Sequence, residues 1–205
     1  MSVIENPLKN IGLQNLNGVC RGDVKDDHSQ VLKLLGYCPI SAETPLIEID
    51  NLTKELGIKK IAFKDERGRM NLGSFKALGA AYVIAKNAYQ KIGKKIKEPY
   101  LASKALKGET FVTASAGNHG LSVAAGAKIF GAEAVIYLSV SVPSGFASKL
   151  KGYGAKVVIE GDDYEASMSA AEEASKLNGW ELLSDVTWDG YEGGIDVMEG
   201  YLIMA

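Results

Sequence analysis

Short apolar runs and longer amphipathic segments alternate along the second half of the chain. Four apolar runs have the length of buried strands: residues 111–113, 134–138, 156–159 and 180–183. Three segments between them have helical spacing and stop at a glycine: residues 121–130, 145–153 and 162–178. Strands separated by helices of this length predict right-handed crossovers and a parallel sheet covered on both faces. The expected fold class is therefore α/β, with three αβα layers.

The first half of the chain has less regular patterning. Two short apolar runs, residues 45–49 and 61–64, predict strands. Apolar residues then recur at three- and four-residue steps over residues 75–92, which predicts a long helix. Two further elements are expected: a short helix within a surface arm formed by residues 1–40, and an apolar helix at residues 198–204.

Composition and charge are those of an ordinary globular protein. Of 205 residues, 46% are hydrophobic and 23% are charged, and the formal net charge is −2 with a pI of 5.8. No block of like charge indicates a nucleic-acid partner, and no apolar run approaches the roughly 20 residues that span a bilayer. The two cysteines lack the spacing of a zinc site. We expect a cytoplasmic enzyme or binding protein with no metal, nucleic-acid or membrane partner.

A lysine lies near the start of the long helix, where residues 73–79 read Gly-Ser-Phe-Lys-Ala-Leu-Gly. If Ser74 caps this helix, Lys76 lies in its first turn among unpaired backbone amides. Positive charge is disfavoured there, so free amine should become available as a nucleophile. The small residues also allow a bulky ligand to approach. From these residues alone, an exposed lysine at a helix start is the more common interpretation.

A loop of small residues connects the first strand of the second half to its helix. Residues 113–120 read Thr-Ala-Ser-Ala-Gly-Asn-His-Gly. At the carboxyl end of a parallel strand, such a loop gathers backbone N–H groups that can hold an anion. Asn118 can both donate and accept hydrogen bonds, whereas His119 is interpreted as a structural histidine. The glycines by themselves are equally typical of an ordinary tight turn.

Asp185 follows the last expected strand, close to Trp188 and Tyr191. A carboxylate beside aromatic residues at a strand end can orient or deprotonate a substrate, although carboxylates in loops are usually just solvated. Residues 64–67 read Lys-Asp-Glu-Arg, which predicts a salt-bridged surface run that could also pack beside the Lys76 segment. The chain has no Walker-type phosphate loop and no Gly-x-Ser-x-Gly motif.

Taken in order, these segments resemble the fold-type II pyridoxal-phosphate enzymes, which include threonine dehydratase and the tryptophan synthase β subunit. Residues 64–66 and 73–79 are similar to the motif of the cofactor-binding lysine, and residues 115–120 to the loop that contacts substrate carboxylate and cofactor. Within this family, residues 75–79 and 185–191 are similar to the motifs of the diaminopropionate ammonia-lyases. The resemblance extends from about Pro45 to the end of the chain.

The resemblance implies a tryptophan synthase β-like fold and a pyridoxal 5'-phosphate-dependent β-elimination that converts 2,3-diaminopropionate, a small amino acid, to pyruvate and ammonia. It implies that Lys76 binds the cofactor and then removes the substrate α-proton, while the pyridine ring accepts the electrons. Phe75 would pack against the ring, Asn118 would bond its 3′-oxygen, and Asp185 would lie near the substrate amine. The substrate carboxylate would be held by Ser115, Ala116, Gly117, Asn118 and His119.

Two departures from the family pattern change what the resemblance implies. The ammonia-lyases carry an aspartate associated with the D-isomer where this chain has Ala116, so activity on D-substrates is not implied. Ser115-Ala116 is more similar to threonine dehydratase, which keeps a serine/threonine dehydratase as the alternative. The family's glycine-rich phosphate loop lies further downstream, and Gly193-Gly194 is too short to replace it. We therefore expect the N-terminal part of a longer enzyme, which is inactive and binds the cofactor weakly or not at all.

The same resemblance predicts that the chain has two parts. Residues 1–109 would be the N-terminal part of the large cofactor domain, with its N-terminal arm, and residues 110–205 would be a smaller αβα domain. Apolar surface left uncovered by a missing half predicts a homodimer. The competing hypothesis is a non-catalytic αβα remnant that binds a small anion. A nucleotide-binding module ranks last, because residues 138–141 offer no acidic residue for a ribose.

Overall fold

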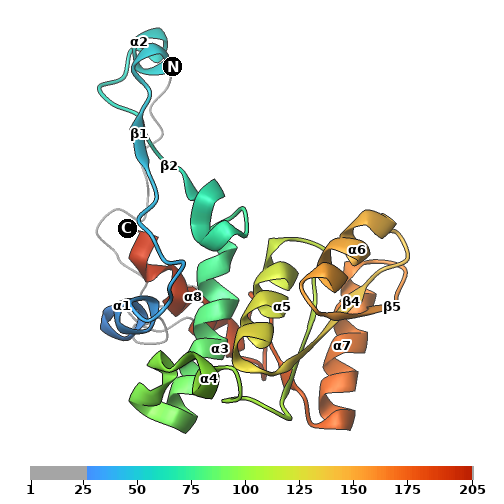
Figure 1. The fold of residues 1–205 in the computed structure, drawn as a ribbon. Helices are drawn as coiled ribbons and strands as arrows, with labels where there is room; N and C mark the ends of the chain where they lie inside the picture. The colour runs from blue at the N-terminus through green and yellow to red at the C-terminus, as the bar shows by residue number, and fades with distance from the viewer. Residues whose placement is uncertain (1–26, 205) are drawn as a thin grey trace.

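The computed structural model describes residues 27–204, which form an α/β body with an arm projecting from it (Figure 1). Most of the expected N-terminal surface arm lies outside the described residues. Within them, the short helix expected there is α1 (Ser29–Leu35), which packs against the body through Val31 and Leu34.

The centre of the body is a four-stranded parallel sheet with the strand order β5-β4-β3-β6. Its strands are β3 (Thr110–Ala114), β4 (Glu133–Leu138), β5 (Lys156–Ile159) and β6 (Glu181–Leu182). The two central strands, β3 and β4, are apolar and buried on both faces, as expected where helices cover a parallel sheet. The predicted α/β class with a parallel sheet is confirmed.

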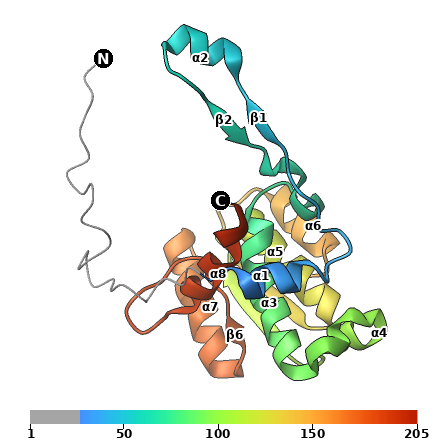
Figure 2. The same cartoon turned by 90° about the vertical axis from the view of Figure 1, so that its left-hand side faces the viewer.

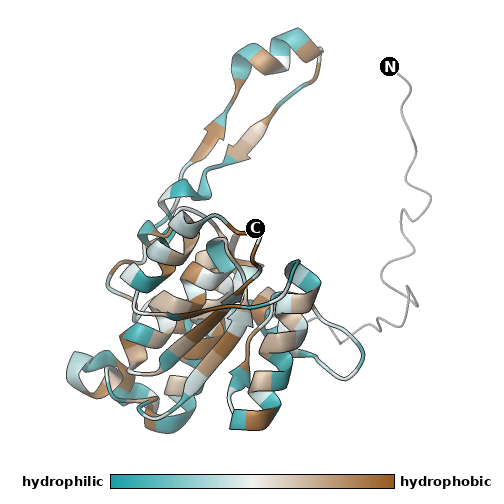
Figure 3. Ribbon diagram, turned by 90° about the vertical axis from the view of Figure 1, so that its right-hand side faces the viewer, coloured by the Kyte–Doolittle hydropathy of each residue, from teal (hydrophilic) through white to brown (hydrophobic). Residues whose placement is uncertain are grey.

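Helices cover the two faces of this sheet. On one face lie α5 (Asn118–Phe130), α6 (Ser144–Gly152) and α3 (Lys76–Ile92), which share one hydrophobic core with alternate residues of β3 and β4. On the other face, α7 (Tyr164–Asn178) packs through Ala171 against Val112 and Val135. Figure 3 shows the apolar strands enclosed between these helices. Core residues lie on both sides of the predicted boundary at 109/110, and the division into two domains stays a prediction.

The chain leaves α3 through the 3₁₀ segment η2 (Gly93–Lys97) and the short helix α4 (Pro99–Ala102). It ends in α8 (Gly193–Gly200) and the 3₁₀ segment η3 (Tyr201–Met204). The extent predicted for the last helix, residues 198–204, is wrong, because the glycine-led first turn of α8 carries no apolar pattern. Glycine allows α8 to approach α3 closely, since a Cβ at Gly200 would lie 2.4 Å from the Leu78 carbonyl oxygen.

The arm is an antiparallel ribbon of β1 (Leu46–Glu48) and β2 (Ala62–Lys64), capped by α2 (Asp50–Leu56). Figure 2 shows it extending away from the body. The two strands are those expected from the sequence, but they pair with each other and not with the parallel sheet.

A buried arginine fixes the base of the arm. Arg69 lies in the 3₁₀ segment η1 (Glu66–Asn71), and its side chain is 4% exposed. The guanidinium donates to both carboxylate oxygens of Glu66 at 2.7 and 2.8 Å, and to Thr44 Oγ1 and the Ala42 carbonyl oxygen at 2.9 Å each. These bonds join the segment before β1 to the segment after β2.

Candidate active site

The candidate site lies where β3 and β6 end. Ser115 directly follows β3, and Asp185 comes shortly after β6. Because β3 and β6 are parallel neighbours, their carboxyl ends lie at the same edge of the sheet and the two segments meet there. Asn118 and His119 come from the first turn of α5, whose leading amides have no partner within the helix.

Lys76 reaches this edge from a loop with an unusual backbone. Met70 and Asn71 have φ values of 47° and 58°, and Gly73 has a φ of 86°. Left-handed φ values are easy for glycine and tolerable for asparagine, but they cost free energy at methionine. After this turn, the Ser74 hydroxyl accepts the Lys76 amide N–H at 3.1 Å, and α3 begins at Lys76. The predicted position of Lys76 in the first turn is confirmed.

An open pocket of about 350 Å³ lies between the α3 start and the sheet edge. Its walls combine one cationic, one anionic and several neutral polar side chains with an aromatic ring. The lining residues are Ser74, Phe75, Lys76, Ala114, Ser115, Gly117, Asn118, His119, Tyr164 and Asp185. The structure thus brings together nearly all residues that the sequence proposed as candidates. Ala116 is the exception, since it packs against the core and does not line the pocket.

An ion pair joins the two predicted catalytic residues. The Lys76 ammonium donates to Asp185 Oδ2, and the side chains are 36% and 15% exposed. Burial would raise the pKa of the Asp185 carboxyl, but the charged surroundings, with the Lys76 ammonium bonded to it, lower that pKa overall. Asp185 is therefore a carboxylate at neutral pH.

The sequence analysis named His119 as a site residue without foreseeing its orientation, and it missed Tyr164 as a pocket residue. The His119 ring is 3% exposed and faces Asp185, with 3.9 Å between Nδ1 and Oδ2. This orientation was not predictable from local sequence, because Asp185 is 66 positions away. Tyr164 was not among the predicted site residues, but it is 48% exposed and lines the pocket. Burial of its hydroxyl end raises its pKa. Its place at the first residue of α7, just after β5, was the available signal.

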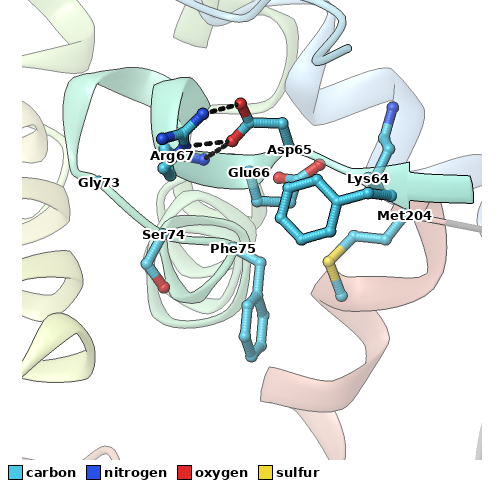
Figure 4. A pocket seen from close by; sticks show the side chains of 9 residues that line it. Lys64, Asp65, Glu66, Arg67, Gly73, Ser74, Phe75 and Met204 are labelled. Carbon is cyan, nitrogen blue, oxygen red and sulfur yellow. Dashed lines mark hydrogen bonds and ion pairs between the residues drawn. The ribbon is translucent and has the colours of Figure 1, made fainter. Parts of the chain in front are cut away.

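A second pocket of about 430 Å³ adjoins the first, and both are lined by Ser74 and Phe75 (Figure 4). Its wall includes residues 64–67, so this charged run does pack beside the Lys76 segment as expected. It is also salt-bridged, since Arg67 donates twice to the Asp65 carboxylate. The Phe75 ring is held edge-on by Tyr201, with 5.2 Å between ring centroids.

Two other kinds of site are absent from residues 27–204. No group of three or more histidine, cysteine, aspartate or glutamate side chains is arranged to hold a metal ion there. No helix in this part of the chain is both long and apolar enough to cross a membrane.

The fold is a parallel αβα sheet, and its site has a lysine near the carboxyl ends of the strands. These two features together define the class of enzyme to which the chain belongs. The chain belongs to the family described as pyridoxal-phosphate dependent enzyme, whose profile matches residues 39–202. Diaminopropionate ammonia-lyase from Escherichia coli (strain K12) is 35% identical over 179 residues, which cover 84% of this chain and 44% of that protein. A catabolic L-threonine dehydratase from Staphylococcus aureus (strain USA300) is 30% identical over 173 residues, with 84% and 44% covered.

The solved structures agree with these sequence matches. The crystal structure of E. coli diaminopropionate ammonia-lyase in complex with D-serine superimposes with a TM-score of 0.79 at 29% identity, over 91% of this chain and 49% of that chain. The tryptophan synthase β-like fold expected from the resemblance is thereby confirmed. The chain spans about half the length of the relatives it matches.

Proposed function

We propose that this chain carries the lysine side of the active site of a pyridoxal-phosphate-dependent carbon–nitrogen lyase acting on 2,3-diaminopropionate. The observation that carries the proposal is the pocket in which Lys76, Asn118 and Asp185 meet at the carboxyl ends of β3 and β6. Sequence similarity to ammonia-lyases of E. coli and Salmonella typhimurium supports the substrate. The products would be pyruvate and two molecules of ammonia.

The pocket residues fit pyridoxal phosphate. Lys76 supplies a primary amine for its aldehyde, Phe75 offers a partly exposed ring beside that amine, and Asn118 offers an amide on the pocket wall. When bound, the cofactor supplies an electron sink for the substrate α-carbon. None of the residues that line this pocket is proposed to hold the phosphate group of the cofactor.

The chain's own residues would perform three tasks in this reaction. Lys76 would take the proton from the substrate α-carbon, because its amine lines the pocket and a free amine can act as a general base. Asp185 would hold a substrate ammonium group with the carboxylate that now holds Lys76. The leading amides of α5, with Ser115 and Gly117, would bind the substrate carboxylate.

The first test is absorbance of the purified chain titrated with excess pyridoxal phosphate. Because binding is expected to be weak, we expect a visible band in the parent chain only at excess cofactor, lost in Lys76→Ala and kept in Lys91→Ala. Lys91 is a suitable control because it is an exposed lysine near the other end of α3. Identical titrations for the parent and Lys76→Ala would overturn the proposal.

A serine/threonine dehydratase is the second candidate. It is favoured by the Ser115-Ala116 loop and by similarity to the S. aureus threonine dehydratase. Product stoichiometry separates the two, because 2,3-diaminopropionate yields twice as much ammonia as keto acid, whereas serine yields equal amounts. If keto acid formed from serine or threonine but not from 2,3-diaminopropionate, the proposed function would change from ammonia-lyase to dehydratase.

The predicted homodimer also belongs to this proposal. Apolar side chains on the arm support it, since Leu46 is 64% and Phe63 is 48% exposed. Sedimentation velocity over a range of concentrations tests the prediction. We expect a dimer that dissociates in Leu46→Ser/Phe63→Ser, and a parent chain that stays monomeric at high concentration would contradict it.

A further inference from the structure

The His119 ring has one bonded nitrogen and one bare nitrogen. Nε2 lies 2.8 Å from the Leu183 carbonyl oxygen, and a carbonyl can only accept a hydrogen bond. Nε2 therefore carries the proton, and in the neutral ring Nδ1 is an acceptor. Nδ1 is fully buried and has no hydrogen-bond partner among the described residues. A buried acceptor without a donor costs free energy unless a ligand supplies one.

The ring stays neutral in this setting. Burial lowers the pKa of His119, while Asp185 and the Leu183 carbonyl oppose this to a smaller extent. Nδ1 therefore keeps its lone pair and faces Asp185 Oδ2 at 3.9 Å. Two acceptors cannot bond to each other, so this geometry calls for a donor between them. The Lys76 ammonium already bonds one of the two, Asp185 Oδ2.

We infer that His119 Nδ1 and Asp185 Oδ2 form a two-acceptor site for an ammonium group, which selects substrates with a second amino group. The inference rests on the proposed function, in which Lys76 would hold the cofactor and Asp185 would be free to bind the substrate. Both residues line the pocket, so the vacated carboxylate and the bare nitrogen would become available to a substrate group bound there. The substrate group that fits them is a β-ammonium, as in 2,3-diaminopropionate.

The number of donors explains the selection. An ammonium has several N–H donors and can satisfy Nδ1 and Oδ2 at once, and its charge complements the carboxylate. A β-hydroxyl, as in serine or threonine, has one O–H donor and would leave one acceptor bare. A site with a buried acceptor left unpaired discriminates strongly against the poorer ligand. His119 would therefore be a specificity-determining residue.

Nuclear magnetic resonance of the histidine ring nitrogens tests the site directly in this chain. The sequence has two histidines, so His28→Gln leaves His119 as the only signal. In this background, Lys76→Ala removes the resident ammonium, and methylammonium is added as the probe. We expect a saturable shift of Nδ1 with methylammonium and none with tetramethylammonium, which has the same charge but no N–H donor. Equal shifts with both cations, or a protonated Nδ1 at pH 7, would overturn the inference.

A second variant separates the ring nitrogen from the charge. In His119→Gln, the side-chain amide can still donate to Leu183, but the acceptor at the Nδ1 position is lost. Calorimetry should show methylammonium binding to Lys76→Ala about ten-fold or more tightly than to Lys76→Ala/His119→Gln. Equal affinities, with both variants folded by circular dichroism, would overturn the inference. These readouts use no cofactor, so they are independent of the absorbance titration that tests the proposed function.

Discussion

The strands of the body and the strands of the arm are both rich in apolar residues but have opposite surroundings. β4 is apolar and is buried at all but its first residue, whereas all three residues of β1 are exposed. Figure 3 shows apolar residues both within the body and along the arm. The difference arises from the connections, because parallel strands need crossover helices that then cover the sheet, whereas the arm closes on itself through α2.

An apolar run is often taken to indicate both an extended conformation and burial, but the body and the arm show that these two properties are separate. The run predicts an extended conformation, but burial depends on which elements pack against it. A two-stranded ribbon alone is marginally stable in water. The arm must therefore gain its order from its base or from a partner, whereas the body is stabilised by its own core.

The largest expected effect compares one substitution in both regions. Ile136 in β4 is 0% exposed and Ile47 in β1 is 42% exposed. Ile136→Ala should lower the free energy of unfolding by about 4 kcal/mol, because it removes buried methyl groups and leaves a cavity. Ile47→Ala should change it by less than about 0.5 kcal/mol. Urea unfolding of both variants measures this, and similar losses would show that the arm is buried in solution.

Removing the arginine at the base of the arm should have the next largest effect. Arg69→Leu leaves the Glu66 carboxylate buried without its partner, which costs about 3 kcal/mol. The loss should be local, so amide exchange should accelerate in β1 and β2 and stay slow in β3 and β4. Arg67→Leu is the matched control, because Arg67 is 81% exposed and bonds only the neighbouring Asp65. Faster exchange in β3 and β4 as well would contradict a locally anchored arm.

A smaller effect is expected at the contact between α3 and α8, which lies within the body. A Cβ at Gly79 would approach Val197 Cγ1 and the Tyr201 hydroxyl oxygen to 2.6 Å each. Gly79→Ala should therefore destabilise the body by about 2 kcal/mol. Gly145→Ala in α6 meets nothing within 4 Å and should be neutral or slightly stabilising. Thermal unfolding compares them, and a neutral Gly79→Ala would mean that α8 packs less closely than described.

The body was predictable because its signals are local. Apolar runs, helical spacing and stop glycines such as Gly131 and Gly179, both left-handed at a helix end, lie within a few residues of the elements they define. The separation of the arm from the parallel sheet was not predictable in this way. β1 pairs with β2 across the connection that contains α2, and neither apolar run by itself indicates this pairing.

The candidate site was predictable in its residues but not in its geometry. The motifs around Lys76 and Asn118 were found by their resemblance to a family. The pairing of Lys76 with Asp185, 109 positions away, required the fold. The role inferred for His119 depends on which ring nitrogen faces Leu183, and rotamer and tautomer leave no trace in the sequence.

The smallest expected effect is a pH dependence of the free energy of unfolding, which arises from a residue of the body. The arm should not contribute to it. Burial lowers the pKa of His119 from its ordinary value of 6.5. Below that pH, the unfolded chain binds a proton that the folded ring does not, so stability falls as the pH falls. The lowered pKa of Asp185 acts in the same direction, but only below its ordinary value of 3.8.

Urea unfolding between pH 7.5 and 5.5 isolates the histidine contribution, because carboxyl groups with ordinary pKa values stay ionised there. We expect stability to decrease over this range in the parent and in His28→Gln, since His28 is exposed. The decrease should disappear in His119→Gln, which has no ring to protonate. If the decrease persisted in His119→Gln, the ring would not be the neutral buried group that the structure describes. Nδ1 would then have no free lone pair for an ammonium, and the selection of a second amino group would lose its basis.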